Sequence, residues 1–262
     1  MSVRPAFEKA SADDRAALVG YLPAGFPSVE RGIEAMRAMV DAGCDVIEVG
    51  LPYSDPVMDG PTIQAAAQRA LQAGFRTRDA LRTVEAVAAT GTPTLVMTYW
   101  NPVERYGVDR FAADLASAGG SGLITPDLTP DSGSTWIAAA DDHHLDKIFL
   151  VAPSSTDERI AMTTAASRGF VYATAVMGVT GARATTSGLA APLVARAKAV
   201  TDLPVAVGLG VSNGDQAAEV AAYADGVIVG SAFVRCLVDH DRTSHAALTA
   251  LVDDLAQGVR RG

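Results

Sequence analysis

The chain has 262 residues, of which 49% are hydrophobic and 19% are charged, and its formal net charge is −9. This composition supplies a substantial apolar core and is unlike that of disordered chains. The acidic balance argues against nucleic acid as a partner, because neutralising phosphates requires Lys and Arg. A small phosphorylated substrate stays compatible with this charge, because backbone N–H groups can hold a phosphate locally.

The chain shows no targeting or membrane signal. The segment from Met1 to Asp14 is polar and mixed in charge, which is unlike a signal peptide. No apolar run reaches the roughly 18 residues that a membrane span needs. Cys44 and Cys236 lack metal-ligand spacing, which indicates free thiols in a reducing compartment. We expect a cytoplasmic protein with no membrane partner and no metal site.

Eight short apolar runs recur along the chain, each followed by a helix-forming stretch. Such runs are typical of strands buried on both faces of a parallel sheet. They begin near Ala17, Asp45, Pro93, Gly122, Lys147, Phe170, Pro204 and Gly226. Eight strand–helix units predict a single α/β domain over residues 1–262, a (β/α)8 TIM barrel with additional helices. A doubly wound open sheet is the alternative, but no G-x-G-x-x-G turn follows the first run.

Hydrophobic periodicity and capping residues place the intervening helices. Pro61, for example, suits the first turn of a helix that ends before Gly74. The expected helices are Val29–Ala42, Pro61–Ala73, Arg78–Ala89, Val108–Ala118, Asp157–Ser167 and Asp215–Tyr223, with a short extra helix at Phe233–Val238.

A glutamate interrupts the second strand near its end. In Asp45-Val-Ile-Glu-Val-Gly50, alternation places Val46, Glu48 and Gly50 on one face and the remaining apolar residues on the other. The apolar face suits the surrounding helices, so Glu48 is expected to point into the barrel mouth. Burial there would raise its pKa and equip it for proton transfer near neutral pH. Glu48 could instead hold the mouth together through hydrogen bonds.

The segment after this strand, from Leu51 to Gln64, is long and proline-rich and lies where such barrels build their active sites. It carries Asp59, which would form a carboxylate pair with Glu48, the two having separate roles. A turn residue or a helix cap is the structural alternative for Asp59, because Gly60 and Pro61 follow it.

Glycine-bearing segments follow the sixth, seventh and eighth strands, at 178–181, 208–212 and 230–231. Loops after the last two strands of these barrels commonly bind phosphate through backbone N–H groups and a helix N-terminus. Alternatively, the glycines serve only to form three tight turns that need a positive φ. The positions of two aromatic residues have two interpretations each. Tyr172 packs in the core or faces the barrel mouth, and Tyr99 lines the substrate pocket or packs at the top of the barrel.

Several segments together resemble the tryptophan synthase α subunit: Ile47–Ala66 (IEVGLPYSDPVMDGPTIQAA), Thr98–Pro102 (TYWNP), Gly178–Arg183 (GVTGAR), Gly208–Ser212 (GLGVS) and Asp225–Ala232 (DGVIVGSA). Their order covers almost the whole chain. The resemblance implies retro-aldol cleavage of indole-3-glycerol phosphate to indole and glyceraldehyde 3-phosphate. It also implies an αββα heterotetramer in which indole passes to a β subunit. Pyridoxal phosphate is expected only on that partner, and no cofactor is expected here.

The resemblance also implies roles for individual residues. Glu48 matches the acid/base glutamate, and Asp59 matches the aspartate that interacts with the indole N–H. Thr180 matches a threonine that closes the site over Asp59. The predicted substrate-binding residues are Tyr172, Thr180, Gly181, Gly210, Gly230, Ser231, Tyr99 and Ile63, of which Gly181, Gly210, Gly230 and Ser231 fall on phosphate-binding loops.

Three other functions stay open at this stage. The chain could be a weakly active subunit that mainly activates a β subunit, or a lyase that works alone and releases free indole. A different phosphate-binding barrel enzyme is the third, although it would not explain the loop from Asp55 to Gln64.

Overall fold

The strands form one parallel sheet in the computed structural model, which describes residues 1–174, 188–208, 210–239 and 245–262. Within those ranges nine strands follow the order β5-β4-β3-β2-β1-β9-β8-β7-β6. Their bounds are β1 Ala17–Pro23, β2 Val46–Gly50, β3 Thr94–Met97, β4 Gly122–Ile124, β5 Asp146–Ile148, β6 Leu150–Val151, β7 Val171–Thr174, β8 Val205–Gly208 and β9 Gly226–Val229.

The sheet closes into a barrel between β5 and β6. Only Phe149 separates these two strands, so the two ends of the sheet order are consecutive parts of one run of the chain. The Phe149 carbonyl accepts a hydrogen bond from the Tyr172 N–H at 3.1 Å, which continues the ladder toward β7. The predicted (β/α)8 barrel is confirmed, and its fifth predicted run corresponds to the two short strands.

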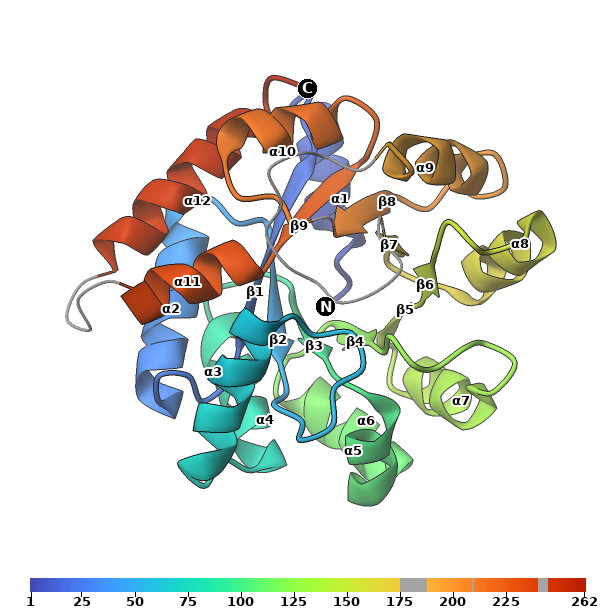
Figure 1. Ribbon diagram of the computed structural model, residues 1–262. Helices are drawn as coiled ribbons and strands as arrows, with labels where there is room; N and C mark the ends of the chain where they lie inside the picture. The colour runs from blue at the N-terminus through green and yellow to red at the C-terminus, as the bar shows by residue number, and fades with distance from the viewer. Residues whose placement is uncertain (175–187, 209, 240–244) are drawn as a thin grey trace.

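The helices encircle the strands (Figure 1). They are α1 Arg4–Ala12, α2 Val29–Ala42, α3 Pro61–Gln72, α4 Thr77–Ala88, α5 Trp100–Tyr106, α6 Val108–Ser117, α7 Ser134–Asp142, α8 Asp157–Ala166, α9 Ala190–Lys198, α10 Gly214–Ala221, α11 Ser231–Asp239 and α12 Ala246–Gly258. The expected helices are all present, with ends that differ by one or two residues. No helix in the described ranges is both long and apolar enough to cross a membrane.

Five helices have no counterpart among those predicted with bounds: α1, α5, α7, α9 and α12. Trp100 begins α5 instead of extending the third strand, and Pro102 is tolerated in its first turn because the N–H groups there have no intrahelical partner. The carboxylate of Asp127 accepts hydrogen bonds from the Trp100 N–H at 2.9 and 3.1 Å and so stabilises this helix start.

Two apolar layers hold the barrel together. The inner layer contains Val19, Val46, Leu95, Ile124, Ile148, Phe170, Ala206 and Ile228, one side chain from each predicted strand run. The outer layer lies between strands and helices and includes Ile47 and Val49 of β2 with Met36 and Met39 of α2. The predicted alternation along β2 is therefore confirmed, with Val46 inside and its neighbours outside.

Helix α1 closes the N-terminal end of the barrel. Phe7 belongs to the inner layer, and its ring lies 5.1 Å from that of Phe170. A Cβ at position 226 would lie 2.8 Å from Phe7, so Gly226 leaves the space that this ring occupies.

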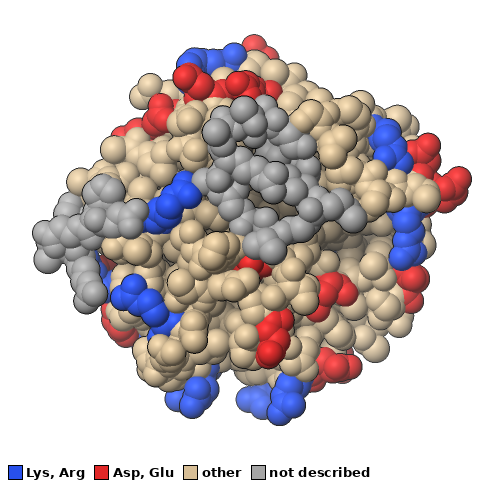
Figure 2. Space-filling view, viewed as in Figure 1, with Lys and Arg blue, Asp and Glu red and all other residues tan. Residues whose placement is uncertain are grey.

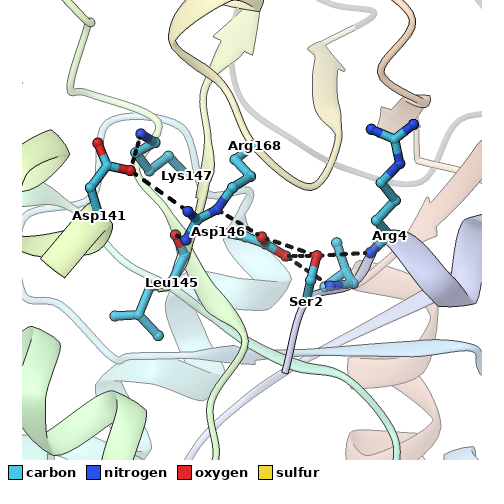
Figure 3. A network of polar contacts seen from close by, with 8 residues as sticks. Ser2, Arg4, Asp141, Leu145, Asp146, Lys147 and Arg168 are labelled. Atoms are coloured by element: carbon cyan, nitrogen blue, oxygen red, sulfur yellow. Dashed lines mark hydrogen bonds and ion pairs between the residues drawn. The ribbon is translucent and has the colours of Figure 1, made fainter. Parts of the chain in front are cut away.

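The segment before α1 is held to β5 by a buried carboxylate (Figure 3). Asp146 accepts hydrogen bonds from the Val3 N–H at 2.8 Å and from the Ser2 hydroxyl at 3.0 and 3.1 Å. The Arg168 Nε lies 3.4 Å from the same carboxylate. Burial raises the pKa of Asp146, and these contacts offset part of that rise.

We expect Phe7→Ala to lower the free energy of unfolding by about 3 to 4 kcal/mol, because it leaves a cavity inside the barrel. Urea denaturation measures this loss. Val200→Ala, at a half-exposed position, is the control and should change stability by less than about 0.5 kcal/mol. A loss below about 1 kcal/mol for Phe7→Ala would contradict the role of α1 as a packed plug.

Candidate active site

Glu48 lies inside the barrel near the carboxyl end of β2. It pairs in register with Tyr21 of β1 and Leu95 of β3, and it shares the inward face with Val46. Its side chain is fully buried, and neither carboxylate oxygen has a hydrogen-bond partner in the described part of the chain. A purely structural glutamate would have its oxygens paired. The structural alternative for Glu48 is therefore not supported.

Burial determines the acidity of this group. It raises the pKa of Glu48 from 4.5 to about 8, because the ionised form loses its hydration and gains no compensating donor. Both protonation states are therefore accessible near neutral pH, as a group that takes up and returns a proton requires.

Asp59 lies in the loop between β2 and α3. Its carboxylate accepts a hydrogen bond from the Tyr99 hydroxyl at 3.2 Å, and its carbonyl accepts one from the Gln64 side-chain amide at 2.8 Å. Helix α3 has Gly60 at its N-cap, with no side-chain cap hydrogen bond. The helix-cap alternative for Asp59 is therefore wrong. Burial raises the pKa of Asp59, and the Tyr99 hydrogen bond offsets part of the rise.

Tyr172 and Tyr21 lie within electrostatic reach of both carboxylates. Burial raises the pKa of each phenol well above its ordinary value, and the charges of Glu48 and Asp59 raise it further. Tyr172 therefore faces the mouth. The sequence analysis missed Tyr21, although Ala17, Val19 and Tyr21 alternate along β1 and lie on one face.

Glycines at strand ends make room for these rings. A Cβ at Gly50 would lie 2.4 Å from the Tyr21 hydroxyl oxygen, and one at Gly230 would lie 3.0 Å from the Cδ1 atom of the same ring. A Cβ at Gly208 would collide with the hydroxyl of Tyr172. The ends of β2, β8 and β9 thus border the same cavity mouth as the carboxylates.

The predicted phosphate-binding residues lie after β8 and β9. Gly210 has a φ of +76°, a backbone conformation in which a residue with a side chain would be strained. Gly230 follows β9 directly, and Ser231 is the first residue of α11, so the N-terminus of this helix opens at the strand end. Thr180 and Gly181 lie outside the described residues.

The last two predicted substrate-binding residues are placed by their helices. Ile63, on α3, is buried in the outer apolar layer. Tyr99 is buried at the N-cap of α5, with its hydroxyl directed to Asp59. Across the described ranges no three His, Cys, Asp or Glu side chains group as metal ligands. Cys44 and Cys236 are not joined in a disulfide, and the Cys236 thiol lies 3.8 Å from the Ala247 carbonyl oxygen.

Charge on the face seen in Figure 1 is dispersed. Figure 2 shows Lys and Arg side chains in small separate groups, with Asp and Glu side chains between them. Among the residues drawn in colour they form no continuous basic surface on this face.

A parallel (β/α)8 barrel with buried carboxylates at its mouth and glycine-bearing loops beside them defines a barrel enzyme. Residues 7–260 match the family model of the tryptophan synthase alpha chain. The chain belongs to the tryptophan synthase alpha chain family.

Similar proteins align with this chain over nearly their full length. The tryptophan synthase alpha chain of Acidothermus cellulolyticus is 63% identical over 260 residues, which cover 99% of this chain and 97% of that protein. That of Mycobacterium marinum is 60% identical over 257 residues, covering 98% and 94%. A structure of Mycobacterium tuberculosis tryptophan synthase superposes with a TM-score of 0.94 at 59% identity, covering 99% of this chain and 98% of that chain.

The raised pKa of Glu48 predicts a pH-dependent stability. A raised folded-state pKa contributes stability below about pH 4.5 that is lost as pH rises through about 8. We expect Glu48 alone to lower the free energy of unfolding by on the order of 3 kcal/mol between about pH 5 and about pH 8.

Urea denaturation across this pH range, on the wild type and on Glu48→Gln, measures this contribution. The variant should lose most of the pH slope and be the more stable protein at about pH 8. Glu85→Gln, on the exposed face of α4, is the matched control and should keep the wild-type slope. Parallel curves for the wild type and Glu48→Gln would contradict the assignment.

Proposed function

We propose that the chain catalyses the retro-aldol cleavage of indole-3-glycerol phosphate to indole and glyceraldehyde 3-phosphate. The observation that carries this proposal is the buried carboxyl of Glu48, which faces the mouth without a hydrogen-bond partner in the described residues and has a pKa of about 8. Membership in the tryptophan synthase alpha chain family supports it.

Glu48 moves the protons in this mechanism. Cleavage of the bond to indole C3 requires a proton at C3 and the loss of a proton from the hydroxyl of the adjacent carbon, which becomes the aldehyde. A carboxyl group with a pKa near 8 can donate the first proton and then accept the second. The proton is returned, so Glu48 ends the cycle as it began.

Asp59 stabilises the charge that this transfer creates. Protonation at C3 places positive charge on the ring nitrogen, and a fixed carboxylate near that nitrogen lowers the energy of the charged state. The hydrogen bond from Tyr99 favours the ionised form of Asp59 that this role needs.

The substrate phosphate binds at the loops after β8 and β9. Backbone N–H groups at a helix N-terminus favour an anion. Ser231 and Gly230 place that terminus beside Tyr21 and therefore near the carboxylates. Gly210 lies in the loop after β8, while Tyr172 borders the mouth from β7. Thr180 and Gly181 keep their predicted roles in closing the site and holding the phosphate.

The remaining predictions concern partners and cofactors. We propose that a tryptophan synthase β subunit binds this chain in an αββα heterotetramer and receives the indole. Pyridoxal phosphate would then act only on that subunit. The two carboxylates supply the proton transfer and the charge stabilisation that the cleavage needs, so we propose no cofactor for this chain. The single domain over residues 1–262 and the cytoplasmic location stay predictions.

We expect Glu48→Gln to lower the rate of indole release at least 100-fold, because general acid–base catalysis contributes about that much. Indole is measured from indole-3-glycerol phosphate with and without a β subunit. A retained rate above about a tenth of the wild type would exclude the acid/base role. Stimulation of the β subunit that survives Glu48→Gln, with no lyase activity in the wild-type complex, would favour an activator instead.

We expect Ser231→Asp to raise KM for the phosphorylated substrate at least about tenfold, because a carboxylate would repel the phosphate at the start of α11. Ser231→Asn has a similar shape without the charge and is the control. Steady-state kinetics of indole release give both KM values. Equal values for the two variants would place the phosphate elsewhere.

A further inference from the structure

The hydroxyl of Tyr99 makes two hydrogen bonds to the loop that carries Asp59. It accepts one from the Met58 N–H at 3.0 Å and donates one to the Asp59 carboxylate at 3.2 Å. Burial raises the pKa of Tyr99 to about 12, so the hydroxyl keeps the proton that it donates. Within the described residues, no other side chain donates a hydrogen bond to this carboxylate.

A second tyrosine lies against Tyr99. The ring centroids of Tyr53 and Tyr99 are 5.4 Å apart with an interplanar angle of 35°. The Tyr53 hydroxyl accepts a hydrogen bond from the side-chain amide of Asn101 at 3.1 Å. Both ends of the segment from Tyr53 to Asp59 therefore contact Tyr99.

The middle of this segment has few contacts of its own. Ser54, Asp55 and Val57 are exposed, and the Ser54 hydroxyl donates a hydrogen bond to its neighbour Asp55. Tyr99, by contrast, is followed by a fixed helix start, because the Asp127 carboxylate accepts hydrogen bonds from the first N–H group of α5. Gln64 of α3 holds the carbonyl of Asp59, whereas its carboxylate is held by Tyr99 at the start of α5.

We propose that Tyr99 is a positioning residue, which holds the Asp59 carboxylate toward the barrel mouth through its hydroxyl, with Tyr53 fixing the plane of its ring. This role differs from the substrate contact predicted for Tyr99 from the sequence. It rests on the proposed function, in which Asp59 stabilises charge on the indole nitrogen.

The pH dependence of the reaction reports on the same contact. Among the described residues, the titratable groups that share the mouth with Asp59 are Glu48, Tyr21, Tyr99 and Tyr172. The Tyr99 hydrogen bond lowers the pKa of Asp59 against the effect of burial. Removing the hydroxyl therefore raises the pKa of Asp59, and the acid limb of the kcat profile moves to higher pH.

Tyr99→Phe tests the proposal with the ring retained. We expect kcat for indole release to fall at least about tenfold, as expected for loss of a hydrogen bond to a charged group, while KM changes less than about threefold. Tyr106→Phe is the matched control. Tyr106 is the last residue of α5, and its hydroxyl bonds to Asp114 at 2.6 Å, away from Asp59. Tyr106→Phe should keep the wild-type kcat and pH profile.

A double-mutant cycle with Asp59→Asn separates positioning from other roles. If Tyr99 acts through Asp59, Tyr99→Phe should cost little in the Asp59→Asn background. An equal loss in both backgrounds would overturn the proposal. If Asp59→Asn alone leaves kcat unchanged in an active enzyme, the role of Asp59 fails and the positioning role fails with it.

Amide hydrogen exchange tests the contact without using activity. We expect the Met58 amide to exchange at least about tenfold faster in Tyr99→Phe, because its acceptor is lost. Tyr106→Phe should leave this rate unchanged. Unchanged Met58 exchange in Tyr99→Phe would overturn the proposal even in an active enzyme. If Met58 exchanges faster in Tyr99→Phe but the wild-type chain lacks lyase activity, the contact is supported and only the proposed function is rejected.

Discussion

The cost of burying one carboxyl group organises the catalytic end of this barrel. Glu48 has no hydrogen-bond donor among the described residues, so its ionised form is unfavourable, and this is the source of its raised pKa. Its strand pairs in register on both sides, which directs the side chain of Glu48 into the barrel, where it is fully buried. The rigid parallel strands therefore keep Glu48 in the buried environment that raises its pKa, which a flexible loop would not do.

The two carboxylates differ in the way they are held. Glu48 is fixed by backbone pairing within the sheet, whereas Asp59 depends on a side-chain contact with the start of α5. This difference suits the proposed chemistry. The proton carrier needs a dry and constant environment, and the charge-stabilising group needs an orientation that a polar side chain can supply.

Much of this arrangement was predictable from the sequence, because it follows from local periodicity. Alternation along β2 predicted the inward face of Glu48, and Pro61 predicted the start of α3. The bond between Asp59 and Tyr99 was not predictable, because it joins loops 40 positions apart whose shapes depend on the whole barrel. Tyr21 was missed although its strand alternates, because a tyrosine within the apolar run of β1 fits the core as well as the barrel mouth.

The plug at the opposite end of the barrel has a consequence for biosynthesis. The Val3 N–H bonds to Asp146 across 143 positions, and Phe7 packs on Phe170. Helix α1 leaves the ribosome before the surfaces that receive it, which do not exist until Asp146 and Phe170 have also emerged. Closing so long a loop is slow, and contacts of this kind form late in folding. Helix α1 is therefore made before the strands that it closes, yet docks on them late.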